Sequence, residues 1–164
     1  MEHMKKKIQD VNEEDTLLLW ANTLDWYGRY LIDCKKEVDE GITCLRKAYE
    51  ICIDVNGKKH EQTIVMLNDL GTYSNMIGDG DSAINYLKEA AKIGDDFPDM
   101  KDLASIYVNL GQLYLSREMF KESETACQEG LKKAKENENK EAIVEANLCL
   151  KELYKFYTPE KVTT

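Results

Sequence analysis

The fold of this 164-residue chain is decided by two stretches, Leu67-Asn68-Asp69-Leu70-Gly71 and Tyr107-Val108-Asn109-Leu110-Gly111-Gln112-Leu113-Tyr114. The glycine of the first stretch is followed 19 residues later by Ala90, and that of the second is followed 19 residues later by Gly130. The two glycines lie 40 residues apart, and a looser copy of the pattern runs from Gly28 to Ala48. A period of this length predicts stacked helix pairs that bury their apolar faces against one another.

This pattern resembles the tetratricopeptide repeat, in which Trp-x-x-Leu-Gly-x-x-Tyr is followed by Ala-x-x-x-Phe and a small residue. We expect Gly71 and Gly111 to let the two helices of a pair approach closely, and Ala90 and Gly130 to face the next pair. Because the usual period is about 34 residues, we place the surplus between the units, at residues 56–63 and 98–103. The predicted fold is therefore all-α, a tetratricopeptide-repeat superhelix of about three repeats with a C-terminal capping helix.

Helix-capping and helix-breaking residues predict seven helices. The run Asn12-Glu13-Glu14-Asp15 predicts the start of a helix over residues 16–32. Gly57, Gly78 and Gly94 predict helix ends, and Pro98-Asp99 predicts a helix start. A last helix over 140–157 carries Lys151 where the repeat predicts glycine, so we interpret it as a cap with a solvated outer face. The domain covers 12–157, with repeats at about 13–56, 60–95 and 100–136 and flexible ends at 1–11 and 158–164.

Composition narrows the range of partners. A formal charge of −9 and a pI near 4.8 argue against nucleic acid and against anionic lipid, because both recruit clustered Lys and Arg. The longest apolar run, residues 17–21, is too short to cross a membrane. The start, Met1-Glu2-His3-Met4, resembles a vector-derived junction, so we expect the native N-terminus and its targeting information to be missing.

Residues for catalysis or metal binding are not arranged in any known pattern. The chain has two histidines, His3 and His60, and no glycine-rich phosphate loop. The run Asp79-Gly80-Asp81 begins like a calcium loop but lacks the turn glycine at Ile84, so we interpret Asp81 as a helix cap. Five cysteines without a Cys-x-x-Cys pair are interpreted as small buried hydrophobic residues in a reducing compartment, not as a disulfide framework. We predict no enzyme, no cofactor and no bound metal.

The first helix of each pair should line a concave, partner-binding face. Helical spacing assigns nine residues to this groove: Asn22, Asp25, Arg29, Asn68, Thr72, Asn75, Ser105, Val108 and Gln112. Acids at Asp25 and Asp69 would repel an acidic chaperone tail, so we expect no binding of that class of peptide. The alternative is that this face is only the exposed surface of a spacer domain.

Two apolar stripes lie on opposite sides of the first helix. Leu17, Leu24 and Leu31 form the stripe expected to pack on the second helix. Leu19, Trp26 and Tyr30 form the other, which we interpret as an association surface that allows weak self-association. The alternative is that these aromatic rings fold back under the residues that precede Asn12.

A closer resemblance is carried by the run Asn56-Gly57-Lys58-Lys59-His60-Glu61-Gln62-Thr63, which is similar to the Gly-x-x-His-Pro-x-Thr loop of kinesin-light-chain-type repeats, with Glu61 in place of proline. Within that type, the chain resembles the mitochondrial tetratricopeptide repeat protein 19 family. The runs that carry this resemblance are Leu24-Asp25-x-x-x-Arg29-Tyr30-Leu31, residues 62–70, Leu103-Ala104-x-x-Tyr107-Val108-Asn109-Leu110, Lys121-Glu122 and residues 129–135. They correspond to the C-terminal half of such a protein, without its transit peptide and first repeats.

The resemblance implies a protein-binding scaffold at the matrix side of the mitochondrial inner membrane. Such a protein assists assembly or maintenance of complex III of the respiratory electron-transport chain. It binds complex III subunits and helps clear fragments of the Rieske iron–sulphur protein. No binding residues are carried over from the family. The alternative is a cytoplasmic adaptor of the kinesin-light-chain type that binds cargo peptides.

Overall fold

The computed structural model describes the backbone of residues 2–158 and the side chains of residues 13–158. Within that part the chain forms seven α-helices and no strand. The helices are α1 (Glu2–Tyr30), α2 (Val38–Asn56), α3 (Glu61–Met76), α4 (Gly80–Gly94), α5 (Leu103–Ser116), α6 (Phe120–Glu136) and α7 (Lys140–Leu153). A π-helical turn, Leu31–Lys35, continues α1. The predicted all-α arrangement is confirmed.

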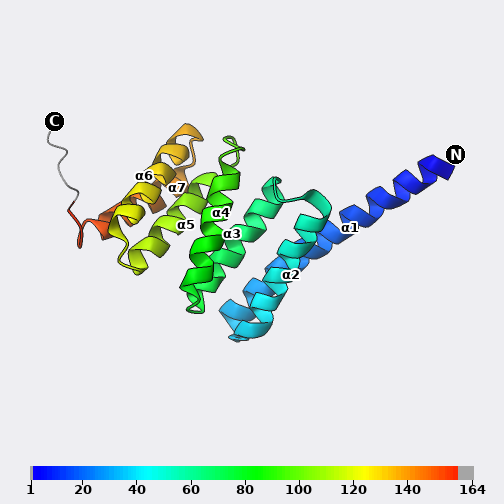
Figure 1. The fold of residues 1–164 in the computed structure, drawn as a ribbon, viewed down its shortest axis with the longest axis horizontal. Coiled ribbons are helices and arrows are strands. Elements are labelled where there is room, and N and C mark those ends of the chain that lie inside the picture. The colour runs from blue at the N-terminus through cyan, green and yellow to red at the C-terminus, as the bar shows by residue number, and fades with distance from the viewer. Residues whose placement is uncertain (1, 159–164) are drawn as a thin grey trace.

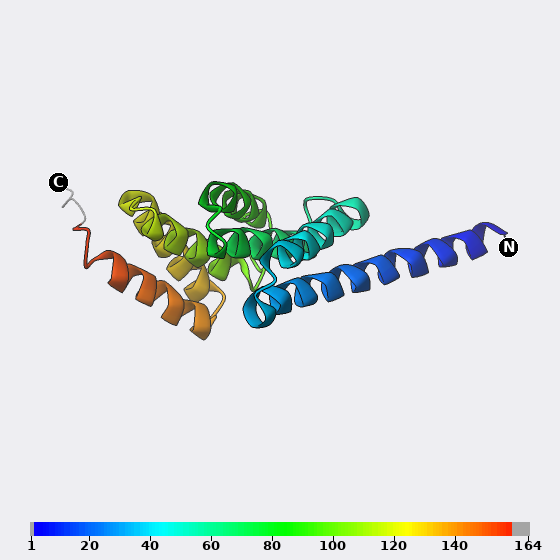
Figure 2. The ribbon, with the colours of Figure 1, turned by 90° about the horizontal axis from the view of Figure 1, so that it is seen from below.

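The helices stack side by side into two rows (Figures 1 and 2). In one row α1, α3, α5 and α7 contact one another in order, and we call this the first-helix row. The second-helix row consists of α2, α4 and α6, each of which packs against the two first helices that flank it in the chain. Neighbouring second helices share no close backbone contact, so only side chains can fill the gaps between them.

Glycine allows the close approach of paired helices. A Cβ on Gly111 would lie 3.1 Å from the backbone nitrogen of Cys127 and 3.3 Å from the carbonyl oxygen of Ser123. The Ser123 hydroxyl donates a hydrogen bond of 2.8 Å to the Gly111 carbonyl across the same contact. Gly71 lies equally close to α4, against the side chains of Leu87 and Tyr86. Both glycines therefore contact the second helix of their own pair, as predicted.

The prediction for Gly130 is wrong. A Cβ there would lie 3.1 Å from the carbonyl oxygen of Ala104 and 3.2 Å from the nitrogen of Val108, both on α5. Gly130 thus faces the first helix of its own pair and not the next unit. Because Gly111 and Gly130 sit on the two facing sides of one pair, α5 and α6 approach closely along most of their length.

Three predicted helix boundaries are also wrong. Helix α1 begins at Glu2 and runs unbroken through Asn12–Asp15, because residues 2–27 contain neither glycine nor proline. Asp79, not Asp81, caps α4, and its carboxylate accepts a hydrogen bond of 3.2 Å from the Ser82 nitrogen. Helix α7 ends at Leu153, short of Tyr157.

Pro98-Asp99 does not start a helix either. The Phe97 nitrogen donates to the Gly94 carbonyl and the Met100 nitrogen to the Phe97 carbonyl, so residues 95–102 form consecutive turns. The Met100 side chain is buried, and the Asn137 side chain donates a hydrogen bond of 3.2 Å to the Pro98 carbonyl. The surplus residues of the repeat therefore form an ordered loop that is held by the following unit.

Other predicted features agree with the structure. Gly57 and Gly78 follow helix ends and have positive φ angles of 76° and 90°, a conformation that glycine adopts readily. Lys151 is exposed on α7. The predicted flexible tail lies outside the described residues apart from Thr158, as do the side chains of the predicted N-terminal segment. Among the described helices, none combines the length and hydrophobicity that a membrane crossing requires.

Candidate functional site

Hydrogen bonds between side chains link the helices of the first-helix row. The Gln62 amide on α3 donates to the Asn22 side chain on α1 at 3.0 Å. The Asn109 amide on α5 donates to the Asn68 side chain on α3 at 3.1 Å. Asn22 and Asn68, both predicted groove residues, therefore join neighbouring units as well as facing outward.

Asp25, Arg29 and Asp69 form a charged cluster between α1 and α3. The Arg29 Nε lies 3.1 Å from the Asp25 carboxylate, and its Nη1 lies 3.7 Å from the Asp69 carboxylate. Burial raises the pKa of Asp69 to about 7; the nearby Asp25 charge adds to this and Arg29 opposes it. Burial also raises the pKa of Asp25, which is only 5% exposed. Asp25 is thus an internal ion-pair partner and offers little surface to a ligand.

Three further predicted groove residues share a small cavity of about 80 Å³ between α3 and α5. They are Thr72, Asn75 and Gln112, and the Thr72 hydroxyl has no hydrogen-bond partner among the described residues. Ser105 is half-buried and lies outside this cavity. Val108 is 1% exposed and packs with Cys127 and Cys149. Its assignment to the groove is wrong, because its side of α5 faces α6 and α7.

The predicted association surface lies beside the groove residues. Leu19 and Trp26 are 67% and 63% exposed, whereas Tyr30 is half-buried and stacks on Trp26 with 5.8 Å between ring centroids. Trp26, Tyr30 and Arg29 line a recess of about 380 Å³ together with Tyr73 of α3. The two predicted sets of residues therefore meet at this recess.

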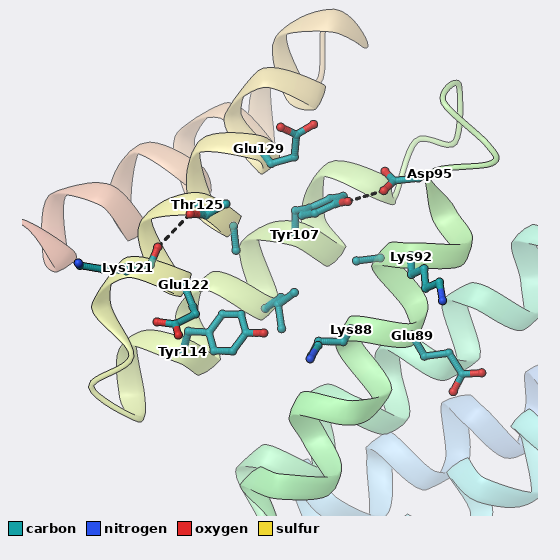
Figure 3. Close-up of a pocket in the computed structure, with 13 residues that line it drawn as sticks. Lys88, Glu89, Lys92, Asp95, Tyr107, Tyr114, Lys121, Glu122, Thr125 and Glu129 are labelled. Atoms are coloured by element: carbon teal, nitrogen blue, oxygen red, sulfur yellow. Dashed lines mark hydrogen bonds between the residues drawn. The ribbon is translucent and has the colours of Figure 1, made fainter. Parts of the chain in front are cut away.

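A groove larger than either of these hollows lies elsewhere, between α4 and α6 of the second-helix row. It has a volume of about 900 Å³, and Leu110 and Tyr114 line it from α5, the helix that contacts both α4 and α6. Figure 3 shows Tyr114 in this position. Ala91 of α4 and Ala126 of α6 lie on its two sides. Sequence reasoning missed it because only the first helices were expected to bind partners. The sequence does contain a signal. Ala91 and Ala126 occupy the positions at which the gap between α2 and α4 has Tyr49 and Tyr86.

One end of this groove carries a polar network. The Tyr107 hydroxyl donates a hydrogen bond of 2.7 Å to the Asp95 carboxylate, and burial together with that hydrogen bond raises the pKa of Tyr107. Lys133 lies 3.0 Å from the other Asp95 oxygen, 3.6 Å from Glu129 and 5.3 Å from the centre of the Tyr107 ring. These contacts fix the shape of the groove at this end.

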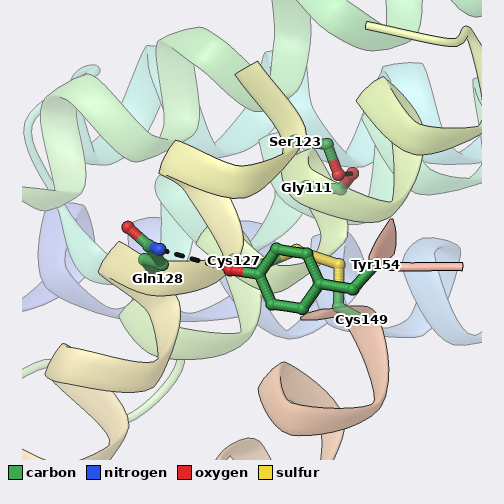
Figure 4. The surroundings of a disulfide bond; sticks show 6 residues. All are labelled: Gly111, Ser123, Cys127, Gln128, Cys149 and Tyr154. Atoms are coloured by element: carbon green, nitrogen blue, oxygen red, sulfur yellow. Dashed lines mark hydrogen bonds between the residues drawn. A yellow bond between two sulfur atoms is a disulfide. The ribbon is translucent and has the colours of Figure 1, made fainter. Parts of the chain in front are cut away.

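A disulfide joins Cys127 of α6 to Cys149 of α7 (Figure 4). The interpretation of all five cysteines as free thiols is therefore wrong for these two. Cys52 is buried as expected, Cys44 is half-buried and Cys34 is exposed. The spacing of the two cysteines does not predict the bond, because they are 22 residues apart. They meet only because α7 packs on α6.

The described part of the chain holds no cluster of metal-binding side chains. No group of three or more His, Cys, Asp or Glu side chains there could hold a metal ion. His60 is exposed and caps α3, accepting a hydrogen bond of 3.2 Å from the Gln62 nitrogen.

Helix pairs with these glycine contacts define a tetratricopeptide repeat protein, which is the class predicted from the sequence. The tetratricopeptide repeat family model matches residues 21–95. Among solved structures, BtubC (BKLC) from P. vanneervenii superposes with a TM-score of 0.64 at 15% identity, covering 88% of this chain and 68% of that chain. The Arabidopsis OM64 TPR domain gives 0.63 at 16% identity, covering 86% and 99%. At such identities the likeness concerns the fold alone.

The curated relatives are the mitochondrial tetratricopeptide repeat protein 19 sequences, so the resemblance seen in the sequence is confirmed. The mouse protein is 30% identical over 82% of this chain and 37% of its own length. The human protein is 29% identical over 95% of this chain and 41% of its own length, and the Drosophila homolog is 25% identical over 92% and 40%. The chain therefore spans about two fifths of the relatives it matches.

Proposed function

We propose that this chain is the protein-binding part of a mitochondrial scaffold that assists assembly or maintenance of respiratory complex III. It binds complex III subunits at the matrix side of the inner membrane and helps to clear fragments of the Rieske iron–sulphur protein. The scaffold has no catalytic activity of its own and needs no cofactor. The observation that carries this proposal is the similarity to mitochondrial tetratricopeptide repeat protein 19 over more than four fifths of the chain.

The first-helix row supplies a surface that suits this role. The predicted groove residues Thr72, Asn75 and Gln112 line one cavity, and Asn22 lies further along the same row. Amide and hydroxyl groups of this kind bind the backbone of an extended peptide without demanding a charged partner. We propose that this surface contacts the complex III subunits.

Affinity capture tests the proposal. The full-length native protein, tagged and expressed in cells of its own organism, should recover complex III subunits from detergent-solubilised mitochondria. Replacing Asn75 and Gln112 by Lys places two bulky cations in the groove and should reduce that recovery. The matched control replaces the exposed Asn147 of α7 by Lys, which adds charge away from the cavity. Recovery of no complex III subunit by the unmodified protein would refute the function.

The location of the full-length protein separates this proposal from the adaptor alternative. Protease protection in isolated mitochondria should place it at the matrix side of the inner membrane. Association with microtubules and cargo in the cytoplasm would favour the kinesin-light-chain-like adaptor. Calorimetry with an acidic chaperone-tail peptide should show no heat, and micromolar binding would contradict the assignment of the groove.

A further inference from the structure

The second-helix row contains two gaps, one on each side of α4. The gap between α2 and α4 is occupied by two aromatic side chains. Tyr49 comes from α2 and Tyr86 from α4, and both pack against the cluster of Ile42, Leu45 and Leu70. The pKa of Tyr49 is raised, chiefly by burial and then by the nearby Glu89. Two rings therefore fill a gap that the backbones leave open.

The gap between α4 and α6 has the same arrangement of helices but lacks the two tyrosine rings. Tyr49 follows Ala48, and Ala91 follows Ala90, which is the equivalent residue 42 positions later. Tyr86 lies four residues before Ala90, and Ala126 lies four residues before Gly130, its equivalent 40 positions later. Both tyrosine positions are thus alanine in the second gap, and this is where the groove of about 900 Å³ opens. Its size lies at the upper end of the range of about 300–1,000 Å³ for binding sites.

Both edges of the groove carry charges of both signs. On the α4 edge Glu89 and Asp95 are paired with Lys58 and Lys133, and Lys121 lies on the α6 edge. Lys88 and Lys92, four residues apart, lie on the α4 edge, and neither forms an ion pair with another described residue. Figure 3 shows Lys88 directed toward Tyr114 across the opening. Glu122 and Glu129 lie on the α6 edge, where Glu129 is already paired with Lys132 and Lys133. An apolar floor with two unpaired lysines along one edge and glutamates along the other is complementary to a helix with one apolar face, one acidic flank and one basic flank.

We propose that the groove between α4 and α6 is a binding site for an amphipathic helix of a partner protein. Large apolar or aromatic side chains of that helix, at positions i, i+3 or i+4 and i+7, occupy the space that the two missing tyrosine rings would fill. Its acidic flank lies along Lys88 and Lys92, and its basic flank lies along Glu122 and Glu129. The inference deepens the proposed scaffold function, on which it rests only in assuming that the chain binds other proteins.

A designed peptide provides the probe. It is a helical peptide of about four turns with Leu and Tyr in the apolar stripe and with Glu and Lys on opposite flanks. Purified protein should bind it in a fluorescence anisotropy titration, and a matched peptide with alanine throughout the stripe should not bind. Ala126→Tyr restores one missing ring and should weaken binding at least tenfold. Asn85→Tyr adds the same side chain to an exposed position of α4 outside the groove and should leave the affinity unchanged.

Charge reversal tests the orientation. Replacing Lys88 and Lys92 by Glu should weaken binding of the charged peptide and reduce its salt dependence, while the affinity for a peptide with glutamine flanks should be unaffected. Thermal unfolding of each variant establishes that it is folded. Equal binding by the protein and by Ala126→Tyr, or no binding of the stripe peptide, would overturn the proposal. Complex III capture from mitochondria is a separate measurement, so either idea can fail while the other stands.

Discussion

The two gaps of the second-helix row, between α2 and α4 and between α4 and α6, differ in the side chains that they contain more than in the helices that surround them. Both are flanked by helices of similar length and lie over a first helix that carries a buried Leu-Gly step, Leu70-Gly71 in one case and Leu110-Gly111 in the other. In the first gap Tyr49 and Tyr86 complete the packing, whereas in the second gap alanines leave a groove. The arrangement of the helices depends on the small residues inside each pair. The residues that fill or open a gap between second helices are not needed for that arrangement, so they can change what the surface binds without changing the fold.

The largest effect is expected where the arrangement of the helices itself is changed. Gly111→Leu should cost about 3–5 kcal/mol, because the new side chain meets backbone atoms of α6 that cannot move aside. Gly71→Leu should cost less, since its nearest neighbours are the side chain of Leu87 and the Cβ of Tyr86 and not backbone atoms. Urea unfolding measures both. Gly130→Leu should be as severe as Gly111→Leu, because it also meets backbone.

Gly57 serves as a control for these variants. It has a positive φ angle and no atom near its Cβ position. Gly57→Ala therefore reports conformational strain alone, about 1 kcal/mol. If Gly111→Leu costs no more than Gly57→Ala, the close pairing of α5 and α6 is refuted.

The pairing of helices could be predicted because it depends on spacings between residues that can be counted in the sequence. A glycine and a small residue 19 positions apart imply two helices in contact, whatever the residues around them. The start of α1 and the loop before α5 could not be predicted in this way. Asn12 is an N-cap only if a helix begins there, and Pro98 starts a helix only if no loop packs around Met100.

The candidate site was predicted less completely than the fold. Helical spacing identified which residues share a face, so Thr72, Asn75 and Gln112 were brought together correctly. It could not show that Val108 faces α6 and α7, because that depends on where the capping helix packs. The groove and the disulfide were missed for a similar reason. Each depends on a neighbour across a gap and not on the residue's own helix.

A smaller effect is expected when the first gap is made to resemble the second. Tyr86→Ala should cost about 2 kcal/mol, since a half-buried ring is removed from well-packed surroundings. The same variant should bind p-cresol, which has the shape of the missing side chain, in the α2–α4 gap, as shown by changes in amide chemical shifts there. Reversible urea unfolding gives the stability. A variant as stable as the unmodified protein would show that Tyr86 does not fill the gap.

The charged cluster of Asp25, Arg29 and Asp69 is a second difference between the repeat that contains α3 and the repeat that contains α5. Asp69 has a raised pKa of about 7, whereas its equivalent 40 residues later is the uncharged Asn109. Because the carboxyl binds protons more tightly in the folded state than at its ordinary pKa of 3.8, the free energy of unfolding should fall as the pH rises through this window. The pKa of about 7 already includes the opposing effect of Arg29. Each pKa unit corresponds to about 1.4 kcal/mol, so we expect a loss of about 2–3 kcal/mol between about pH 5 and about pH 8.

Asp69→Asn gives α3 the residue that α5 carries at the equivalent position, Asn109. The variant should lose most of this pH dependence of the free energy of unfolding. Unfolding in urea at about pH 5 and about pH 8 compares the two proteins across the window. Asp102 also acts on Asp69, so Asp102→Asn is the control and should leave most of the slope in place. A slope that is unchanged in Asp69→Asn would assign the titration to another group.

The smallest effect concerns the side of α1 that faces away from α2, on which no other described helix packs. Trp26 is exposed there and stacks on Tyr30, so its ring is already held in one orientation. An aromatic pair of this kind buries apolar area when two copies meet. We expect weak self-association with a dissociation constant on the order of 1 mM, which corresponds to about −4 kcal/mol. Trp26→Glu should abolish it without unfolding the chain, because the side chain contributes little to the core.

Sedimentation velocity over a range of protein concentrations measures this association. Trp20 is also exposed on α1, and Trp20→Phe leaves Trp26 as the single tryptophan whose fluorescence reports burial. In that background the emission should shift to shorter wavelength as the concentration rises. A strict monomer whose Trp26 emission stays that of a solvated ring at every concentration would contradict the association surface. The recess that Trp26 shares with Arg29 and Tyr73 would then be open at this end of the first-helix row, so a peptide in the groove could extend over the Trp26 ring.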